Sequence, residues 1–128
     1  GSCKRITDLG VSWLCQFLKR FVDLQSLTLN FGNCPKVTDV GVKGVVDCMS
    51  NFAHLRNIDL DFYDCDITEA SLNRISQCLK ARNSLERIHI AFDINEAAGI
   101  TEEVSDNFES EVEKLKVHNP NLQIEWYI

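Results

Sequence analysis

A strand-like segment recurs along the chain, and this repetition constrains the fold more than any other feature. Three copies read LQSLTLNF at Leu24–Phe31, LRNIDLDF at Leu55–Phe62 and LERIHIAF at Leu85–Phe92, and NLQIEWYI at Asn121–Ile128 is a degenerate fourth. Each copy alternates apolar with polar residues, which is the period of a strand with one buried face. We expect the inward side chains to be Leu27, Leu29, Phe31, Ile58, Leu60, Phe62, Ile88, Ile90, Phe92, Ile124, Trp126 and Ile128.

The segments between these copies carry the signals of helices. An Ile-Thr or Val-Thr pair precedes each of them, and in the first three units the threonine lies 17 residues before the next strand leucine. A Thr hydroxyl can accept a hydrogen bond from the free amides of a first helical turn, and the acid that follows each threonine suits the positive end of the helix dipole. Apolar residues then recur at helical spacing. The capping threonines are Thr7, Thr38, Thr68 and Thr101.

Strands and capped helices that alternate in this way predict an α/β fold, a right-handed solenoid of parallel strands with helices on the other side. The motifs CKRITDLGV at Cys3–Val11 and CPKVTDVGV at Cys34–Val42, together with CDITEASL at Cys65–Leu72, resemble the leucine-rich repeat, close to its cysteine-containing and ribonuclease-inhibitor-like subtypes. The resemblance implies strands on a concave face, helices on a convex face, and a non-catalytic role in protein binding, as in scaffold proteins and substrate receptors of ubiquitin ligases. The asparagine ladder of that family is not kept.

The repeat predicts one domain. Residues 1–2 are typical of the remnant of a cleaved tag, and residues 3–128 form a single leucine-rich-repeat domain. Its expected divisions are a partial repeat at 3–23, repeats at 24–54, 55–84 and 85–121, and a closing strand at 122–128. The last repeat is the longest, with an extended loop at Asp93–Gly99 and one extra helical turn.

The bulk composition narrows the functional classes. A net charge of −6 argues against nucleic acid as a partner, and no apolar run is long enough for a membrane span. The six cysteines occur once in a loop and once in a helix of each repeat, which favours reduced, buried thiols over a disulfide framework. We therefore expect a cytoplasmic or nuclear protein.

The two ends of the chain differ in character. The first helix is apolar around more than one face, and Trp13, Leu14 and Phe17 could stack on upstream repeats or on another copy, so the chain is expected to be the C-terminal part of a longer array. An intact domain with exposed apolar residues is the alternative. The last helix, within Thr101–Glu113, holds six acids, and is either a solvated cap or a docking surface for a basic partner.

Reactive groups do not converge in the sequence, so we expect no enzyme, no metal and no cofactor. No Cys-x-x-Cys or His-x-x-x-His pair is present for zinc. Cys65 beside His89 could act as a nucleophile, but its equivalents in the other repeats favour a structural thiol. Asp59, Asp61 and Asp64 could suggest a cation site, although a solvated strand face explains them better.

The strand faces that point away from the helices remain as a binding surface. Neighbouring strands lie about 4.8 Å apart, so their polar side chains should form one continuous patch, acidic in the middle, that suits a partner protein carrying Lys or Arg. A spacer, or an assembly module that stacks through its first helix, is the alternative function. The predicted protein-binding residues are Ser26, Thr28, Asn30, Asn57, Asp59, Asp61, Arg87, His89, Glu125 and Tyr127.

Overall fold

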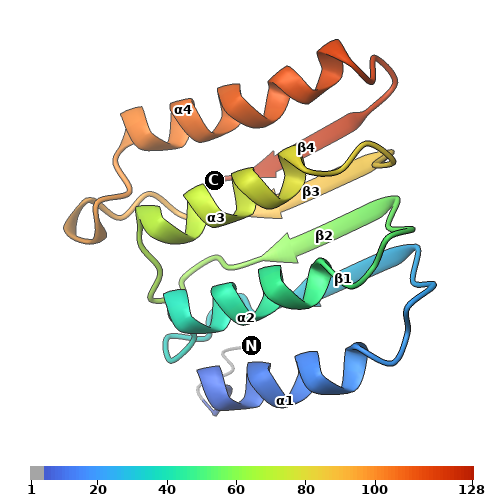
Figure 1. The fold of residues 1–128 in the computed structure, drawn as a ribbon. Coiled ribbons are helices and arrows are strands. Elements are labelled where there is room, and N and C mark those ends of the chain that lie inside the picture. The colour runs from blue at the N-terminus through green and yellow to red at the C-terminus, as the bar shows by residue number, and fades with distance from the viewer. Residues whose placement is uncertain (1–4) are drawn as a thin grey trace.

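The computed structural model describes residues 5–128, so residues 1–4, with the tag remnant predicted at residues 1–2 and the first cysteine, Cys3, lie outside the described residues. Helices and strands alternate along this part of the chain (Figure 1). The α-helices are α1 (Asp8–Leu18), α2 (Asp39–Met49), α3 (Glu69–Lys80) and α4 (Glu102–Glu113). The strands are β1 (Ser26–Asn30), β2 (Asn57–Asp61), β3 (Arg87–Ala91) and β4 (Gln123–Tyr127), and the 3₁₀ helices are η1 (Glu96–Ala98) and η2 (Lys114–Val117).

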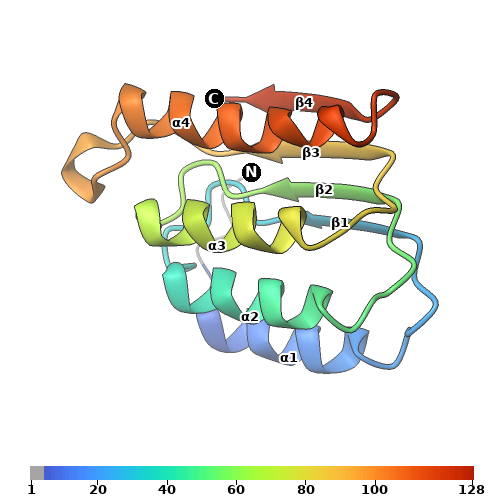
Figure 2. The same cartoon turned by 45° about the horizontal axis from the view of Figure 1, so that its top comes forward.

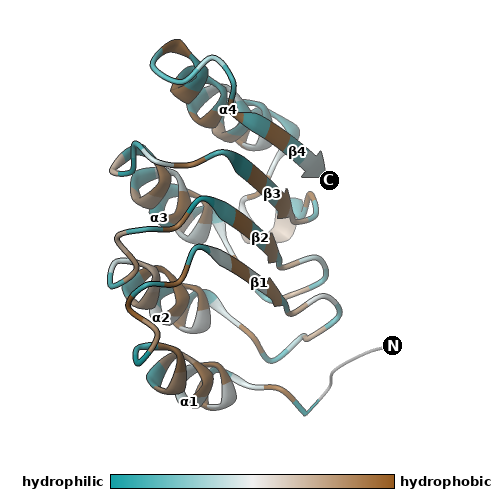
Figure 3. Cartoon of the chain, turned by 90° about the vertical axis from the view of Figure 1, so that its right-hand side faces the viewer, coloured by the Kyte–Doolittle hydropathy of each residue, from teal (hydrophilic) through white to brown (hydrophobic). Residues whose placement is uncertain are grey.

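The strands form one parallel sheet in the order β1-β2-β3-β4, so every strand lies beside its predecessor in the sequence. All four α-helices cover the same face of this sheet, and the other face is left without helices (Figures 2 and 3). We call this second surface the open face. The sequence prediction of an α/β fold with parallel strands and a separate helical layer is confirmed.

The core lies between the sheet and the helices. The inward strand residues are in register, with Leu27, Ile58, Ile88 and Ile124 in one row and Leu29, Leu60, Ile90 and Trp126 in the next. Phe31 and Phe62 directly follow the last residues of β1 and β2, and their rings stack with centroids 5.9 Å apart. Burying a side chain of this size contributes roughly 1.5–3 kcal/mol, so each buried member of these rows stabilises the sheet substantially.

The predicted helix caps are confirmed at all four α-helices. The hydroxyls of Thr7, Thr38, Thr68 and Thr101 accept hydrogen bonds from backbone amides of the first helical turn. The extra length of the last unit is also confirmed. The additional residues form the loop that contains η1 and the additional helical turn η2. Gly99, which caps the end of η1, has φ 82°.

The acid that follows the capping threonine has a second role that the helix dipole did not predict. Asp8 accepts hydrogen bonds from the amide of Thr38 at 2.8 Å and from its hydroxyl at 2.6 Å. Asp39 makes the same two bonds to Thr68, at the same distances, and also accepts from Ser71 Oγ. We call these contacts the carboxylate ladder. It joins the start of α1 to that of α2, and the start of α2 to that of α3.

Two side chains, Ile128 and Leu14, are placed differently from the expectation of the sequence analysis. Ile128 was expected to point inward, but it is 40% exposed because it follows the last residue of β4, at the sheet edge. Leu14 was expected to be available for stacking, but it is half-buried against the core.

In the part of the chain described here, no helix combines the length and the apolar character that crossing a bilayer requires.

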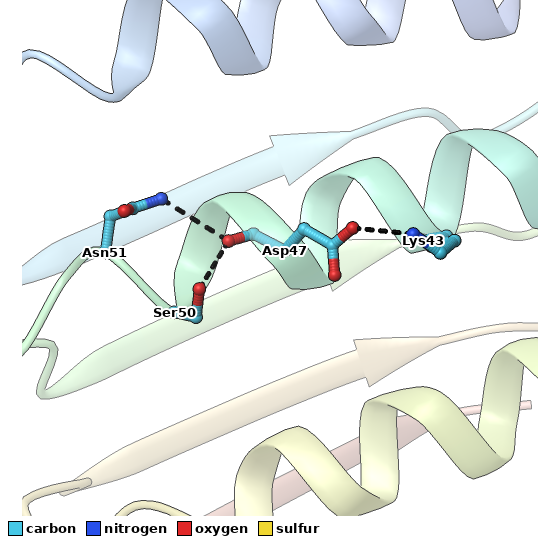
Figure 4. Close-up of polar contacts among 4 residues, drawn as sticks. All are labelled: Lys43, Asp47, Ser50 and Asn51. Atoms are coloured by element: carbon cyan, nitrogen blue, oxygen red, sulfur yellow. Dashed lines mark hydrogen bonds and ion pairs between the residues drawn. The ribbon is translucent and has the colours of Figure 1, made fainter.

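The carboxylate ladder predicts a measurable difference between two aspartates of α2. Replacing Asp39 with Ala removes the acceptor of three hydrogen bonds, and we expect the free energy of unfolding to fall by about 2–3 kcal/mol. Asp47→Ala is the matched control, because the Asp47 carboxylate contacts only the exposed Lys43 (Figure 4) and should cost less than about 0.5 kcal/mol. Urea unfolding followed by circular dichroism measures both. Equal losses would contradict the ladder.

The ladder should also make stability depend on pH. Burial on its own raises the pKa of Asp39, but hydrogen bonds from Ser71 and Thr68 outweigh it, and the pKa lies below the ordinary value of 3.8. A lowered pKa means that Asp39 contributes stability above the unfolded-state pKa and loses it as the pH falls through the folded-state pKa. The stability difference between the wild type and Asp39→Ala should therefore shrink between about pH 6 and about pH 2. A constant difference across this range would argue against the ionised ladder.

Candidate functional site

The open face collects all ten residues that the sequence analysis predicted for protein binding. The parallel register arranges them in three rows across β1, β2, β3 and β4, because partners in register point the same way. All ten are exposed or half-exposed. The rows are Ser26, Asn57, Arg87 and Gln123; Thr28, Asp59, His89 and Glu125; and Asn30, Asp61, Ala91 and Tyr127. Their proximity is shown, and their role in binding stays a prediction.

The middle row contains an ion pair or hydrogen bond between neighbouring strands. His89 Nδ1 lies 2.9 Å from Asp59 Oδ1, and both side chains remain partly accessible to solvent. Glu125 is the register partner of His89 on its other side. His89 is therefore held between two carboxylate-bearing positions, and the contact with Asp59 fixes how both side chains present themselves.

The rim at the carboxyl ends of the strands is shaped by polar side chains that bind backbone amides. Asn30 Oδ1 accepts from Gly32 N at 2.8 Å, and Asp61 Oδ1 accepts from Tyr63 N at 2.9 Å. Asp93 Oδ1 accepts from Asp64 N at 3.0 Å in the next loop. These bonds fix the turns. The carboxylates of Asp61 and Asp93 also give this rim a negative charge.

An aromatic pair lies on the same rim, and sequence reasoning missed one of its members. The rings of Tyr63 and Tyr127 have centroids 5.3 Å apart and planes tilted by 57°. Tyr127 was predicted, but Tyr63 follows the repeated strand pattern and carries no motif of its own. The one available signal was its place directly after Phe62, where the chain leaves the strand. Ala91, the register partner of Asp61 and Tyr127, is buried beside them.

The five cysteines that the structure describes lie away from the open face. Cys65 is buried, and its Sγ donates a hydrogen bond to the backbone oxygen of Phe31 at 2.9 Å. Burial, the largest cause, raises the pKa of Cys65 to about 12. A thiol in this state is a poor nucleophile, which favours the structural role over the Cys65–His89 alternative. Among residues 5–128, no three His, Cys, Asp or Glu side chains come together in a way that could hold a metal ion.

A hollow of about 370 Å³ lies on the helical side, between the carboxyl-terminal ends of α2 and α3. Asp47, Cys78 and Arg82 are among its lining residues. The guanidinium of Arg82 donates to the backbone oxygen of Met49, the last residue of α2, and to that of Phe52 in the loop that follows. Ser50 and Asn51 both donate side-chain hydrogen bonds to the backbone oxygen of Asp47 at the same helix end (Figure 4). This hollow is therefore shaped by helix termination.

The predicted stacking residues at the other end are only partly available. Trp13 is 72% exposed and Phe17 is 54% exposed, and Leu14 between them packs inward. The exposed positions share one face of α1, which no other part of the described chain covers.

Comparisons with known proteins bear on the fold. No protein-family model matches the chain, and no curated protein matches it. Among solved structures, the chain is similar to actin-binding site 2 of leiomodin-1, with a TM-score of 0.64 and 16% sequence identity over 100% of this chain and 68% of that one. At this identity, the similarity shows a shared fold.

The burial of the thiols predicts their chemical reactivity. Burial also raises the pKa of Cys15 to about 12, so Cys15 and Cys65 should both resist iodoacetamide at about pH 8 in the folded protein. Cys78 is half-buried and should react faster than either. Mass spectrometry of tryptic peptides after timed alkylation measures the order, with protein in denaturant as the control in which all three react. Rapid alkylation of folded Cys65 would reopen the nucleophile alternative.

Proposed function

We propose that the chain is a leucine-rich-repeat module, a right-handed solenoid whose open face is the concave face, and that it acts without catalysis by binding a protein partner. The registered parallel strands, the helices confined to one side and the capped repeats support this reading. A rigid sheet holds side chains at fixed spacing, which limits the entropy lost on binding.

The charge of the open face favours a partner with exposed Lys or Arg side chains. Asp59 and Asp61 lie on β2 and Glu125 lies on β4, on either side of β3, and Asp61 accepts a hydrogen bond from the amide of Tyr63, a member of the Tyr63–Tyr127 pair. Carboxylates attract a cation, and tyrosine rings can stack on a guanidinium or take up the aliphatic part of a basic side chain. The single observation that carries the proposal is this combination of acids and tyrosines on one exposed face.

The structural neighbour agrees with a role in protein binding. The leiomodin-1 segment of the same fold is described as an actin-binding site. We infer from it that a fold of this kind can serve as a binding module, and we argue the chemistry of the partner from the residues of this chain alone. The buried thiols fit a reducing compartment, and we propose the cytoplasm or nucleus.

The proposal predicts which peptides the protein selects. A phage-displayed random peptide library provides the probe, and selected peptides should carry at least one Lys or Arg. The double variant Asp59→Asn with Asp61→Asn removes two charges but keeps oxygen acceptors for His89 and for the amide of Tyr63. We expect it to weaken binding of a selected peptide at least about tenfold, and more at low salt.

Asp47→Asn is the control for this experiment, because it removes one charge from the helical side of the sheet. It should leave the affinity unchanged within about twofold. Isothermal titration calorimetry at two salt concentrations measures the three proteins. Selected peptides without basic residues, or equal affinity for the double variant, would refute the proposal.

A further inference from the structure

Charge is distributed unevenly along the strands of the open face, and a general preference for basic partners does not account for this. In the first row, at the amino ends of the strands, Arg87 is the charged side chain. In the middle row Asp59 and Glu125 flank His89, and in the third row the charged side chain is that of Asp61. The face therefore changes from basic to acidic along the direction of the strands.

A hollow of about 430 Å³ lies at the amino ends of β2, β3 and β4, on the basic side of this gradient. Its lining is polar, and most of the side chains are amides. The acid among them, Glu86, is 3.8 Å from the guanidinium of Arg56, so arginines outnumber carboxylates at this rim. The lining residues are Asn57, Glu86, Arg87, Asn119, Asn121 and Gln123.

The hollow offers hydrogen-bond donors that the protein itself does not use. Within residues 5–128, the guanidinium of Arg87 makes no ion pair and no hydrogen bond. Asn57 donates one bond to Ser26 Oγ, and Asn119 donates one to the backbone oxygen of Leu85, so each amide keeps a second N–H. A guanidinium binds a carboxylate through two parallel hydrogen bonds, and neighbouring amide groups can donate to the same oxygens. The chemistry of the hollow therefore suits a carboxylate.

The rim at the carboxyl ends of the strands suits the opposite charge. Asp61 and Asp93 each accept a hydrogen bond from a backbone amide, and neither pairs with a basic side chain of the described chain. Burial is the largest cause of the raised pKa of Cys65, and the charges of Asp61 and Asp93 add to it, so both carboxylates act near the same point. The rings of Tyr63 and Tyr127 lie at this rim as well.

We propose that the open face binds an extended segment of a partner protein that carries an Asp or Glu at one end and a Lys or Arg at the other. Arg87 and the amides of the hollow bind the carboxylate, and the rim with Asp61 and Tyr127 binds the basic side chain. This inference rests on the proposed function and adds a second charge to the partner. A segment with basic residues alone would leave Arg87 without a counter-charge beside its own positive charge.

The spacing of the two charges follows from the strand. Arg87 and Ala91 are the first and last residues of β3, and a rise of about 3.3 Å per residue separates the two rims by about 13 Å. An extended segment covers this distance when its acidic and basic residues are about four positions apart.

A double-mutant cycle on a peptide selected by phage display tests the proposal. The peptide has an amidated carboxyl terminus, and a second form has Asn or Gln in place of the acid about four positions from its basic residue. Both are titrated into the wild type and Arg87→Gln by isothermal titration calorimetry. We expect either change to weaken binding about tenfold and both together to cost little more than one, because they remove the same ion pair. Independent, multiplying losses would overturn the proposal.

The variants are chosen so that folding does not decide the outcome. Arg87 is exposed, so Arg87→Gln should keep the wild-type circular dichroism spectrum. Arg74→Gln is the matched control, because Arg74 is also exposed but lies on α3, and it should leave the affinity unchanged within about twofold.

A second selection separates this inference from the proposed function. Peptides selected on Arg87→Glu should carry Lys or Arg where those selected on the wild type carry the acid. Wild-type peptides with a basic residue but no acid at this spacing would overturn the inference and leave the proposed function standing. Peptides without basic residues would overturn both.

Discussion

No single strand and helix of this chain can bury its apolar side chains alone, and the molecule depends on the registered contact between successive units. Each inward strand residue lies beside the equivalent residue of the next unit, so that Leu27, Ile58, Ile88 and Ile124 share one layer. The carboxylate ladder fixes the helices in the same order as the strands, through Asp8 and Asp39. From α1 to α3, both a helix start and a strand are thus held at each step, and one unit cannot slide along the next without breaking both. This is the nearest-neighbour logic of repeat proteins.

The same register that builds the core also builds the surface. Because side chains alternate along a strand, a row that is apolar on one face of the sheet implies a row of exposed side chains on the other. Thr28, Asp59, His89 and Glu125 therefore become neighbours although the sequence separates them widely. The contact between Asp59 and His89 shows that neighbours on this face already interact across strands. A partner would meet a surface whose side chains are partly oriented before binding, which is the condition under which few contacts give useful affinity.

Much of this arrangement could be predicted from the sequence, and the remainder has identifiable physical reasons. Period-two alternation predicted the strands and their inward faces, and the threonines predicted the helix starts, because both signals are local. The partners of Asp8 and Asp39 could not be predicted, since the length of the intervening loop decides whether a carboxylate reaches the next helix. The third unit shows this limit. Glu69 follows the same threonine, yet no ladder bond joins it to Thr101, where the loop before the helix is longer. Tyr63 was missed because it lies outside the repeated strand segment, and because its partner Tyr127 comes from a different unit, the degenerate fourth copy.

The acids of α4 set the character of the sheet edge that β4 forms. Glu111 binds Lys80 of α3 and Lys114, and these hydrogen bonds lower its pKa to about 2. Glu113 binds Lys116 and accepts from Trp126 Nε1, which ties the helix to β4. Burial and the nearby Asp106 and Glu113 raise the pKa of Glu109, so charge repulsion along this helix is real. Acids that are paired within the molecule, together with acids that repel one another, favour a solvated face over a docking surface. The negative charge at this edge discourages a second sheet or helix from adding there, so the acids act beside β4 as charged residues do on natural edge strands.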